Sequence, residues 1–287
     1  MRYQGSKRFF LDTLDTLYTL RVSISKRQKF ISLSFLLTFF LWFLPPALPA
    51  FVALSISLGL TFLVTLYALD FDLRFPEHLI FPIYPMLLAI AVLLHRPETS
   101  QFSFLLIFYT LAILFTFYLL FLTLNILNIA TVRTVPLKKA ALSTLYFVGL
   151  IIGFFNIKGV LQLHPSNFSF FIFHFSLNVA LTLPLIYSIQ IKPSPIEEEI
   201  SPKPKILVPE ILVLGLLSSE IALVASFLKT SPISLATFLA GILFLLISIT
   251  QHIIKKTLTK KIIWEHAAVG VSLIGVLIIS SFSYFSP

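Results

Sequence analysis

The chain has 287 residues, of which 57% are hydrophobic and only 11% are charged, and it contains no cysteine. Soluble domains carry about 25% charged residues, so this composition excludes an ordinary soluble domain and indicates a chain embedded in a membrane over most of its length. The lack of cysteine excludes disulfides, thiolate chemistry, cysteine-based zinc sites and iron–sulfur clusters. The formal net charge of +9 indicates attraction to anionic lipid rather than nucleic-acid binding, because the basic residues lie between apolar runs.

The first segment, residues 1–28, is basic and precedes the first apolar run. Apolar residues recur in it at helical spacing beside charged ones, which predicts a short amphipathic helix lying on the inner membrane surface. A loosely ordered basic tail is the alternative. The residues of the expected stripe are Phe10, Leu14, Leu17 and Arg21.

The first apolar run, 30–44, resembles the core of a cleavable signal peptide, because basic residues precede it and Pro-Pro-Ala-Leu-Pro-Ala follows it. Two features favour its retention as a membrane span. The basic segment is unusually long for a signal peptide, and a second apolar run begins at once, at residue 51. We therefore expect two spans joined by a short proline-rich hairpin.

Nine apolar runs are suited to cross a bilayer as helices, which needs about 20 predominantly apolar residues each. A helix satisfies its own backbone hydrogen bonds, as the hydrocarbon core requires. We predict an all-α polytopic transmembrane helical bundle of about nine spans. Pro82 and Pro85 are expected to kink the third span, because proline has no amide hydrogen. The expected spans are 30–44, 51–69, 79–94, 102–124, 140–155, 168–190, 206–228, 233–254 and 263–282.

The most polar internal stretch is the segment 191–205, which is rich in proline, glutamate and lysine. Such a segment cannot lie in lipid and is typical of a linker. We predict that it divides the chain into a six-span bundle, 29–190, and a three-span bundle, 206–287.

The distribution of basic residues predicts the orientation. In the nine-span topology, 18 of the 21 lysines and arginines fall in the N-terminal segment and the inner loops, and three fall in outer loops. Such an excess marks the cytoplasmic side of a membrane. We expect the N-terminus inside, the C-terminus outside, and a location in the cytoplasmic or an equivalent membrane, with anionic lipids at the basic loops.

Ionisable groups inside a membrane are costly and indicate a functional site. Glu220 lies near the middle of the seventh span, and His174 and Asn178 lie one turn apart in the sixth, at a similar expected depth. We predict that Glu220 pairs with His174 or Asn178, and that the three residues relay a proton or bind a cation or a polar ligand. The alternative is a structural hydrogen bond between the two helices.

A second candidate site lies between the second and third spans. Clustered carboxylates beside a histidine suit the binding of a divalent metal, or acid–base chemistry on a lipid-linked phosphate. The spacing matches no metal-binding motif, and the alternative is a solvated loop whose acids cap the third span. The residues are Asp70, Asp72, Arg74, Glu77 and His78.

Three hypotheses for function follow. The favoured one is a transport or permeation component with Glu220, His174 and Asn178 along a polar path. The second is a non-catalytic membrane subunit or scaffold that binds a membrane-protein partner. The third is a lipid-acting enzyme that uses residues 70–78. The sequence contains no nucleotide-binding, zinc-protease or serine-hydrolase motif, which favours a protein that is not an enzyme and has no cofactor or resident metal.

Overall fold

The described part of the chain is helical apart from its connecting turns. The computed structural model describes residues 25–43, 48–71, 73, 76–95, 104–130, 136–163, 165–190, 208–228 and 230–285. The predicted all-α fold is therefore confirmed. The expected surface helix before residue 25 and the linker 191–205 lie outside the described residues. The helices are α2 (Lys26–Phe43), α3 (Ala50–Ala68), α4 (Glu77–Ile80), α5 (Ile83–Leu94), α6 (Phe104–Ala130), α7 (Lys138–Gln162), α8 (Asn167–Gln190), α9 (Val208–Ser226), α10 (Pro232–Ile254) and α11 (Lys260–Phe285).

Eight spans among the described residues are long and apolar enough to cross a membrane, with α4 and α5 counted together as Glu77–Leu94. Helix α2 corresponds to the remaining predicted span and differs from the others in having three basic residues in its first turn. The outside of the bundle is covered by large apolar side chains, such as Phe51 at 78% and Phe104 at 76% exposure. Such a surface suits lipid and not water, so the protein is a multi-pass membrane protein.

Helices α6, α7 and α11 extend beyond the expected apolar runs, and α6 ends at Ala130 rather than at 124. Helix α7 continues to Gln162 and α11 to Phe285, past the predicted ends at 155 and 282. As a result Lys158, one of the three basic residues that the predicted topology places in outer loops, lies within the last turns of α7. A helix continues through such a position because a lysine side chain reaches out of the apolar layer with its ammonium group.

The third span, in which Pro82 and Pro85 were expected to cause a kink, is interrupted at Pro82, whereas Pro85 lies inside α5. Helix α4 ends at Ile80 and α5 begins at Ile83, with Phe81 and Pro82 between them. By contrast, Pro184 lies inside α8 without ending it. A proline within a helix leaves the carbonyl group four residues earlier without its amide donor, so both prolines release backbone acceptors inside the bundle.

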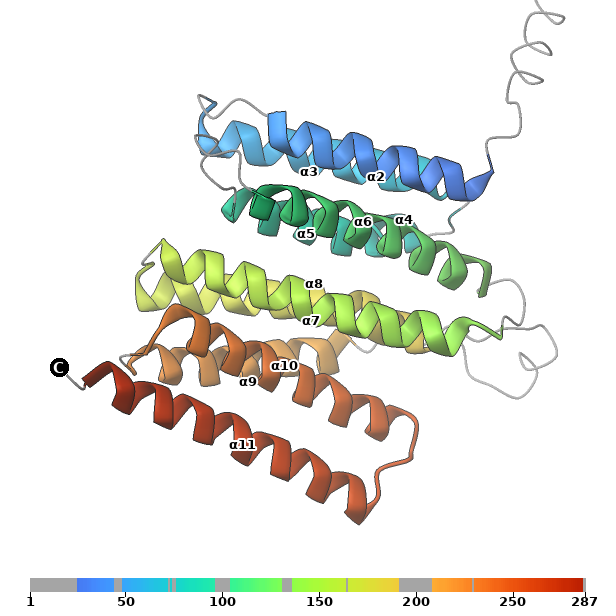
Figure 1. Ribbon diagram of the computed structural model, residues 1–287. Helices are drawn as coiled ribbons and strands as arrows, with labels where there is room; N and C mark the ends of the chain where they lie inside the picture. The colour runs from blue at the N-terminus through green and yellow to red at the C-terminus, as the bar shows by residue number, and fades with distance from the viewer. Residues whose placement is uncertain are drawn as a thin grey trace, which may run out of the picture.

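The helices lie side by side, and the chain progresses across the bundle from α2 to α11 (Figure 1). Helix α2 contacts α3 and α6, α7 contacts α5, α6, α8 and α10, and α8 packs most closely on α9. The α4–α5 span is the most buried, at 61% of its residues, whereas only 6% of the α11 span is buried. Helix α11 thus packs mainly on α10 and leaves most of its surface free.

Apart from Lys158, the described lysines and arginines gather at one end of the bundle, which we call the basic end. It holds the first residues of α2, α7 and α11 and the turn that follows α10, and Figure 1 shows these helix ends on the same side. The positive charge of Lys139, at the start of α7, adds to burial in lowering the pKa of Lys255, which follows α10. The two lysines are therefore neighbours, as the predicted topology requires.

Gly149 allows α7 to approach α5 closely. A Cβ atom at this position would lie 2.6 Å from the hydroxyl oxygen of Tyr84, closer than real Cβ contacts. That hydroxyl group reaches past α7 and donates a hydrogen bond to the carbonyl oxygen of Leu181 in α8, at 3.0 Å. One glycine therefore makes room for a bond that joins α5 to α8.

We expect Gly149→Ala to destabilise the protein, because the new methyl group displaces the Tyr84 hydroxyl and leaves buried polar groups unpaired. The cost of an unpaired buried group is about 1–3 kcal/mol, which exceeds the gain of about 1 kcal/mol from replacing glycine in a helix. Thermal unfolding in detergent micelles measures the difference. The control is Gly59→Ala, where nothing lies within 4 Å of the new Cβ atom. An equal effect of the two substitutions would contradict the prediction.

Candidate functional site

Three fully or almost fully buried polar side chains join α8 to α9. His174 and Asn178 lie one turn apart on α8, and Ser218 faces them from α9. The Asn178 amide nitrogen lies 2.6 Å from Nδ1 of His174 and 2.9 Å from Oγ of Ser218. In this arrangement the amide donates one proton to each neighbour, so Nδ1 of His174 is an acceptor and the ring proton is on Nε2. The predicted shared face of His174 and Asn178 is confirmed.

Glu220 does not join this cluster, which corrects the expected pairing. Its side chain is exposed, and it takes part in none of the ion pairs of the described residues. Ser218 and Glu220 are two residues apart, so their side chains diverge by about 200° around the helix. Because Ser218 faces α8, Glu220 faces away from it. A similar expected depth in the membrane suggested the contact, but depth alone does not set the direction of a side chain.

A row of buried polar residues continues along α8, and we call it the α8 polar column. All its members have fully buried side chains, and at 100° per residue they lie within an arc of about 120°. Each retains one side-chain atom that has no hydrogen-bond partner among the described residues: Nε2 of His174, Oδ1 of Asn178, Oγ1 of Thr182 and Oγ of Ser188. These are four of the ten such atoms in the described part of the chain.

The unpaired hydroxyl groups of the column differ from most hydroxyl groups in the other helices. A serine or threonine in a membrane helix usually donates to the carbonyl oxygen four residues earlier. Ser176, on the exposed side of α8, does so to Ile172 at 2.9 Å, and Ser219 on α9 does so to Gly215. Thr182 and Ser188 donate no such hydrogen bond among the described residues. The same is true of two buried hydroxyl groups on α3, those of Ser57 and Thr61. The α8 hydroxyl groups are therefore available to another polar partner.

The middle of the column lies beside a second polar contact. Tyr84 donates its hydroxyl proton to the Leu181 carbonyl oxygen, close to Pro184. A cavity of about 20 Å³ adjoins this bond and is lined by Tyr84, Tyr146, Gly149, Gly153 and Leu181, among others. A site of roughly 10–15 Å³ holds one water molecule, so the cavity has room for one. Its wall is mostly apolar, with the tyrosine side chains from α5 and α7 as the polar exceptions.

The column ends near a buried carboxyl group at the basic end. Glu77, the first residue of α4, is only 4% exposed. The hydroxyl group of Tyr187 on α8 donates a hydrogen bond to its Oε1 at 3.1 Å, and the ring of Phe81 packs edge-on against the Tyr187 ring. Tyr187 precedes Ser188 of the column. A titratable carboxyl group thus stands at one end of the column and an imidazole ring towards the other.

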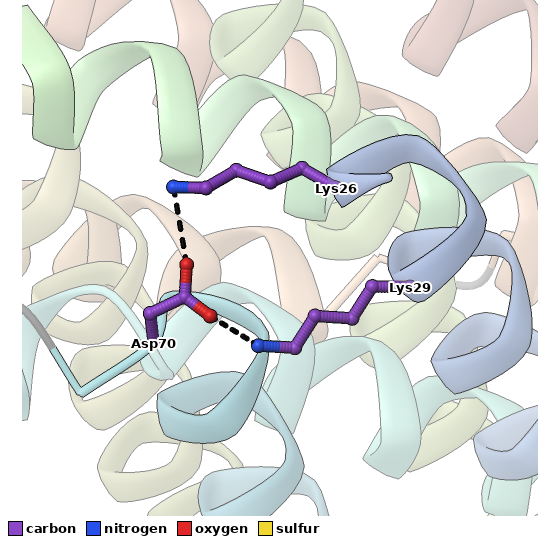
Figure 2. A network of polar contacts seen from close by, with 3 residues as sticks. All are labelled: Lys26, Lys29 and Asp70. Carbon is purple, nitrogen blue, oxygen red and sulfur yellow. Dashed lines mark hydrogen bonds and ion pairs between the residues drawn. The ribbon is translucent and has the colours of Figure 1, made fainter. Parts of the chain in front are cut away.

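Asp70 instead holds the ends of α2 and α3 together (Figure 2). Its carboxyl group binds Lys29 through Oδ1 and Lys26 through Oδ2, the latter at 3.1 Å. The Lys29 ammonium group also lies 4.1 Å from the centre of the Tyr67 ring. Asp70 and Phe71 have positive φ angles of 60° and 54°, a conformation that aspartate tolerates better than most residues. The turn therefore places the carboxyl group against two lysines.

The second predicted cluster is not gathered at one point among its described members. Asp70 contacts α2, whereas Glu77 contacts α8, and His78 is half-buried on α4. Asp72 and Arg74 lie outside the described residues. In the part of the chain that the structure describes, no group of three or more histidine or acidic side chains is placed to hold a metal ion. A role for this cluster in acid–base chemistry stays a prediction.

Sequence reasoning missed three residues of this region: Tyr84, Tyr187 and Ser218. Each forms a hydrogen bond between helices. The two tyrosines are polar groups in otherwise apolar spans, which indicates that each hydroxyl group needs a partner but does not identify that partner. Nothing in the sequence distinguished Ser218 from the other serines of the spans.

Comparison with known proteins connects part of this region to a family. A model of a family described as a protein of unknown function (DUF5656) matches residues 168–280. The matched range includes the α8 polar column, Ser218 and Glu220, and it crosses the segment 191–205. No curated protein and no solved structure matches the chain.

We expect Asp70→Asn to lower the free energy of unfolding by about 0.5–1 kcal/mol at neutral pH, the range of partly exposed ion pairs. Burial raises the pKa of Asp70, but the hydrogen bonds and charges of Lys29 and Lys26 outweigh it, so the net pKa lies below the ordinary 3.8. The stabilisation is therefore complete above pH 3.8 and is lost as the pH falls through the lower pKa of the folded state.

Unfolding curves of the protein and of Asp70→Asn, recorded in detergent at pH 7 and at successively lower pH, measure this effect. The matched control is Glu265→Gln, because Glu265 forms only an exposed pair with Lys261 at 3.9 Å. A stability difference for Asp70→Asn that persists unchanged below the ordinary pKa of aspartate would show that the ion pair is not its cause.

Proposed function

We propose that this membrane protein conducts protons along the α8 polar column. The observation that carries the proposal is the row of four buried side chains with unpaired polar atoms on one face of α8. The row extends from His174 to Ser188, a helix length of roughly 21 Å at 1.5 Å per residue. That length is most of a hydrocarbon core of about 30 Å. Buried polar atoms are normally paired, so this row suits a chain of polar or protonic contacts.

The groups near the two ends of the column support a proton as the permeant. An imidazole ring takes up a proton on one nitrogen and releases one from the other, and a carboxyl group binds and releases one proton. Glu77 with Tyr187 lies at the basic end, and His174 lies towards the opposite end. A proton that enters at one of these groups leaves at the other, and no group is consumed.

The packing between the helices supports a proton over a larger solute. The cavity beside Tyr84 has a volume of about 20 Å³, and large apolar residues, among them Leu177, Leu181 and Leu185, fill the rest of the buried face of α8. A proton passes along hydrogen bonds without needing an open channel. The Tyr84 hydroxyl group and one water molecule in the cavity would extend the column at its middle.

We expect His174→Gln and Glu77→Gln each to reduce proton flux by about tenfold or more. This is a conservative figure, because a positioned proton-transfer group usually contributes about 100-fold or more to a rate. Glutamine at either position keeps a hydrogen-bond acceptor but carries no exchangeable acidic proton. The measurement uses the full chain in liposomes that contain a pH-sensitive dye, with flux driven by a potassium diffusion potential.

The matched control is Ser176→Ala, because Ser176 lies on the exposed side of the same helix and bonds only to its own backbone. Its flux should equal that of the unchanged protein. Wild-type liposomes that acidify no faster than liposomes without protein would refute the proposal, as would equal flux in all four proteins.

A second function, that of a membrane subunit which binds other membrane proteins, is favoured by one observation. Only 6% of the α11 span is buried, whereas the other candidate spans are 28–61% buried. A helix with so few contacts is held weakly by its own chain. This subunit function is compatible with proton conduction and differs from it in needing a partner.

A further inference from the structure

Glu220 stands alone on the outer face of α9. The residues around it on that face are Val213, Leu216, Leu217, Val224 and Phe227, all of them exposed. Glu220 is roughly 18 Å along the helix from Val208 and 9 Å from Ser226, so it lies inside the apolar part of the span. We call this set of side chains the α9 outer face.

The chain itself offers no counter-charge to this carboxylate among its described residues. The ion pairs of the described part of the chain join Asp70 to Lys26 and Lys29, and Glu265 to Lys261. The buried serines of α9, Ser218 and Ser219, lie on its opposite face against the bundle, and its other acidic residue, Glu210, lies in its first turn. An ionisable side chain in a membrane helix normally faces the bundle interior, water or a partner group. Among the described residues, Glu220 faces neither the bundle interior nor a polar neighbour.

We propose that the α9 outer face binds a transmembrane helix of another protein, and that a lysine or arginine of that helix pairs with Glu220. Charge complementarity identifies the occupant: a carboxylate surrounded by leucine and valine needs a cationic donor, and charge-assisted hydrogen bonds are about twice as strong as neutral ones. The apolar residues on either side provide the surface against which the partner helix packs. A single carboxylate without further ligands does not form a metal site.

A second copy of this chain fits the face less well. Such a partner would have to bring a cation to the depth of Glu220, and among the described spans Lys158 is the basic residue nearest the matching helix end. Lys158 is partly buried in α7, which lies between α5, α6, α8 and α10. Its position among four neighbours restricts access to another bundle. The inference is independent of the proposed proton conduction.

The experiment measures association between the full chain and designed single-span peptides in liposomes by fluorescence energy transfer. One peptide is an apolar leucine–alanine helix with a single arginine placed to meet Glu220. The control peptide has the same sequence with leucine in place of the arginine. We expect the arginine peptide to associate about tenfold more strongly than the leucine peptide. We expect Glu220→Gln to remove that difference, while Glu265→Gln, which changes an exposed glutamate at the basic end, preserves it.

A charge exchange distinguishes a direct pair from an indirect effect. Glu220→Arg should bind a peptide that carries glutamate at the same position and should lose preference for the arginine peptide. Unfolding temperatures of the variants in detergent establish that each is folded, and because Glu220 is exposed they should match the unchanged protein. Equal binding of both peptides to the unchanged protein would overturn the proposal. Energy transfer between two labelled copies of the chain that depends on Glu220 would also overturn it, in favour of self-association.

Discussion

The structure depends on the requirement that every backbone amide and carbonyl group in the membrane has a partner. Helices meet this requirement within themselves, and proline is the exception. Pro184 continues α8 but removes the amide donor of the Ala180 carbonyl oxygen, and the next carbonyl oxygen along the chain, that of Leu181, accepts a hydrogen bond from Tyr84. Asn156 on α7 similarly donates to the carbonyl oxygen of Leu87 on α5. Side chains that bind the backbone of another helix thus fix how α5, α7 and α8 pack.

The α8 polar column is an exception to the same requirement for the side chains of the described spans. Most hydroxyl groups of the spans donate a hydrogen bond to a carbonyl oxygen of their own helix, and so they need no partner on a neighbouring helix. The column differs because His174, Asn178, Thr182 and Ser188 are fully buried and each keeps an atom without a hydrogen-bond partner in the part of the chain that the structure describes. Polar groups of this kind weaken the packing of an apolar bundle, so their presence along one helix is more easily related to function than to stability.

Two kinds of charge are treated differently by this fold. Asp70 lies beyond the end of α3, at the basic end, where two lysines neutralise it and water reaches all three groups. Glu220 lies within a span and on its outer side, and no lysine or arginine of the described residues pairs with it. The charge of Asp70 therefore joins two helices of one chain, whereas the charge of Glu220 is available to a partner. It also explains why the most conspicuous ionisable residue of the sequence is absent from the buried site.

The sequence by itself determined the helical class, the positions of the spans, a proline irregularity in the third span and the one-turn spacing of His174 and Asn178. Those features follow from local rules: the length of an apolar run, the missing amide of proline, and the helical repeat. Only the tertiary structure decided that Ser218 and not Glu220 meets Asn178, and that Asp70 and Glu77 serve different helices. Such contacts depend on the rotation of each helix about its axis, and rotation is set by the packing of all its neighbours. Almost every residue of these spans is apolar, so the sequence pattern carries little record of which side faces the bundle.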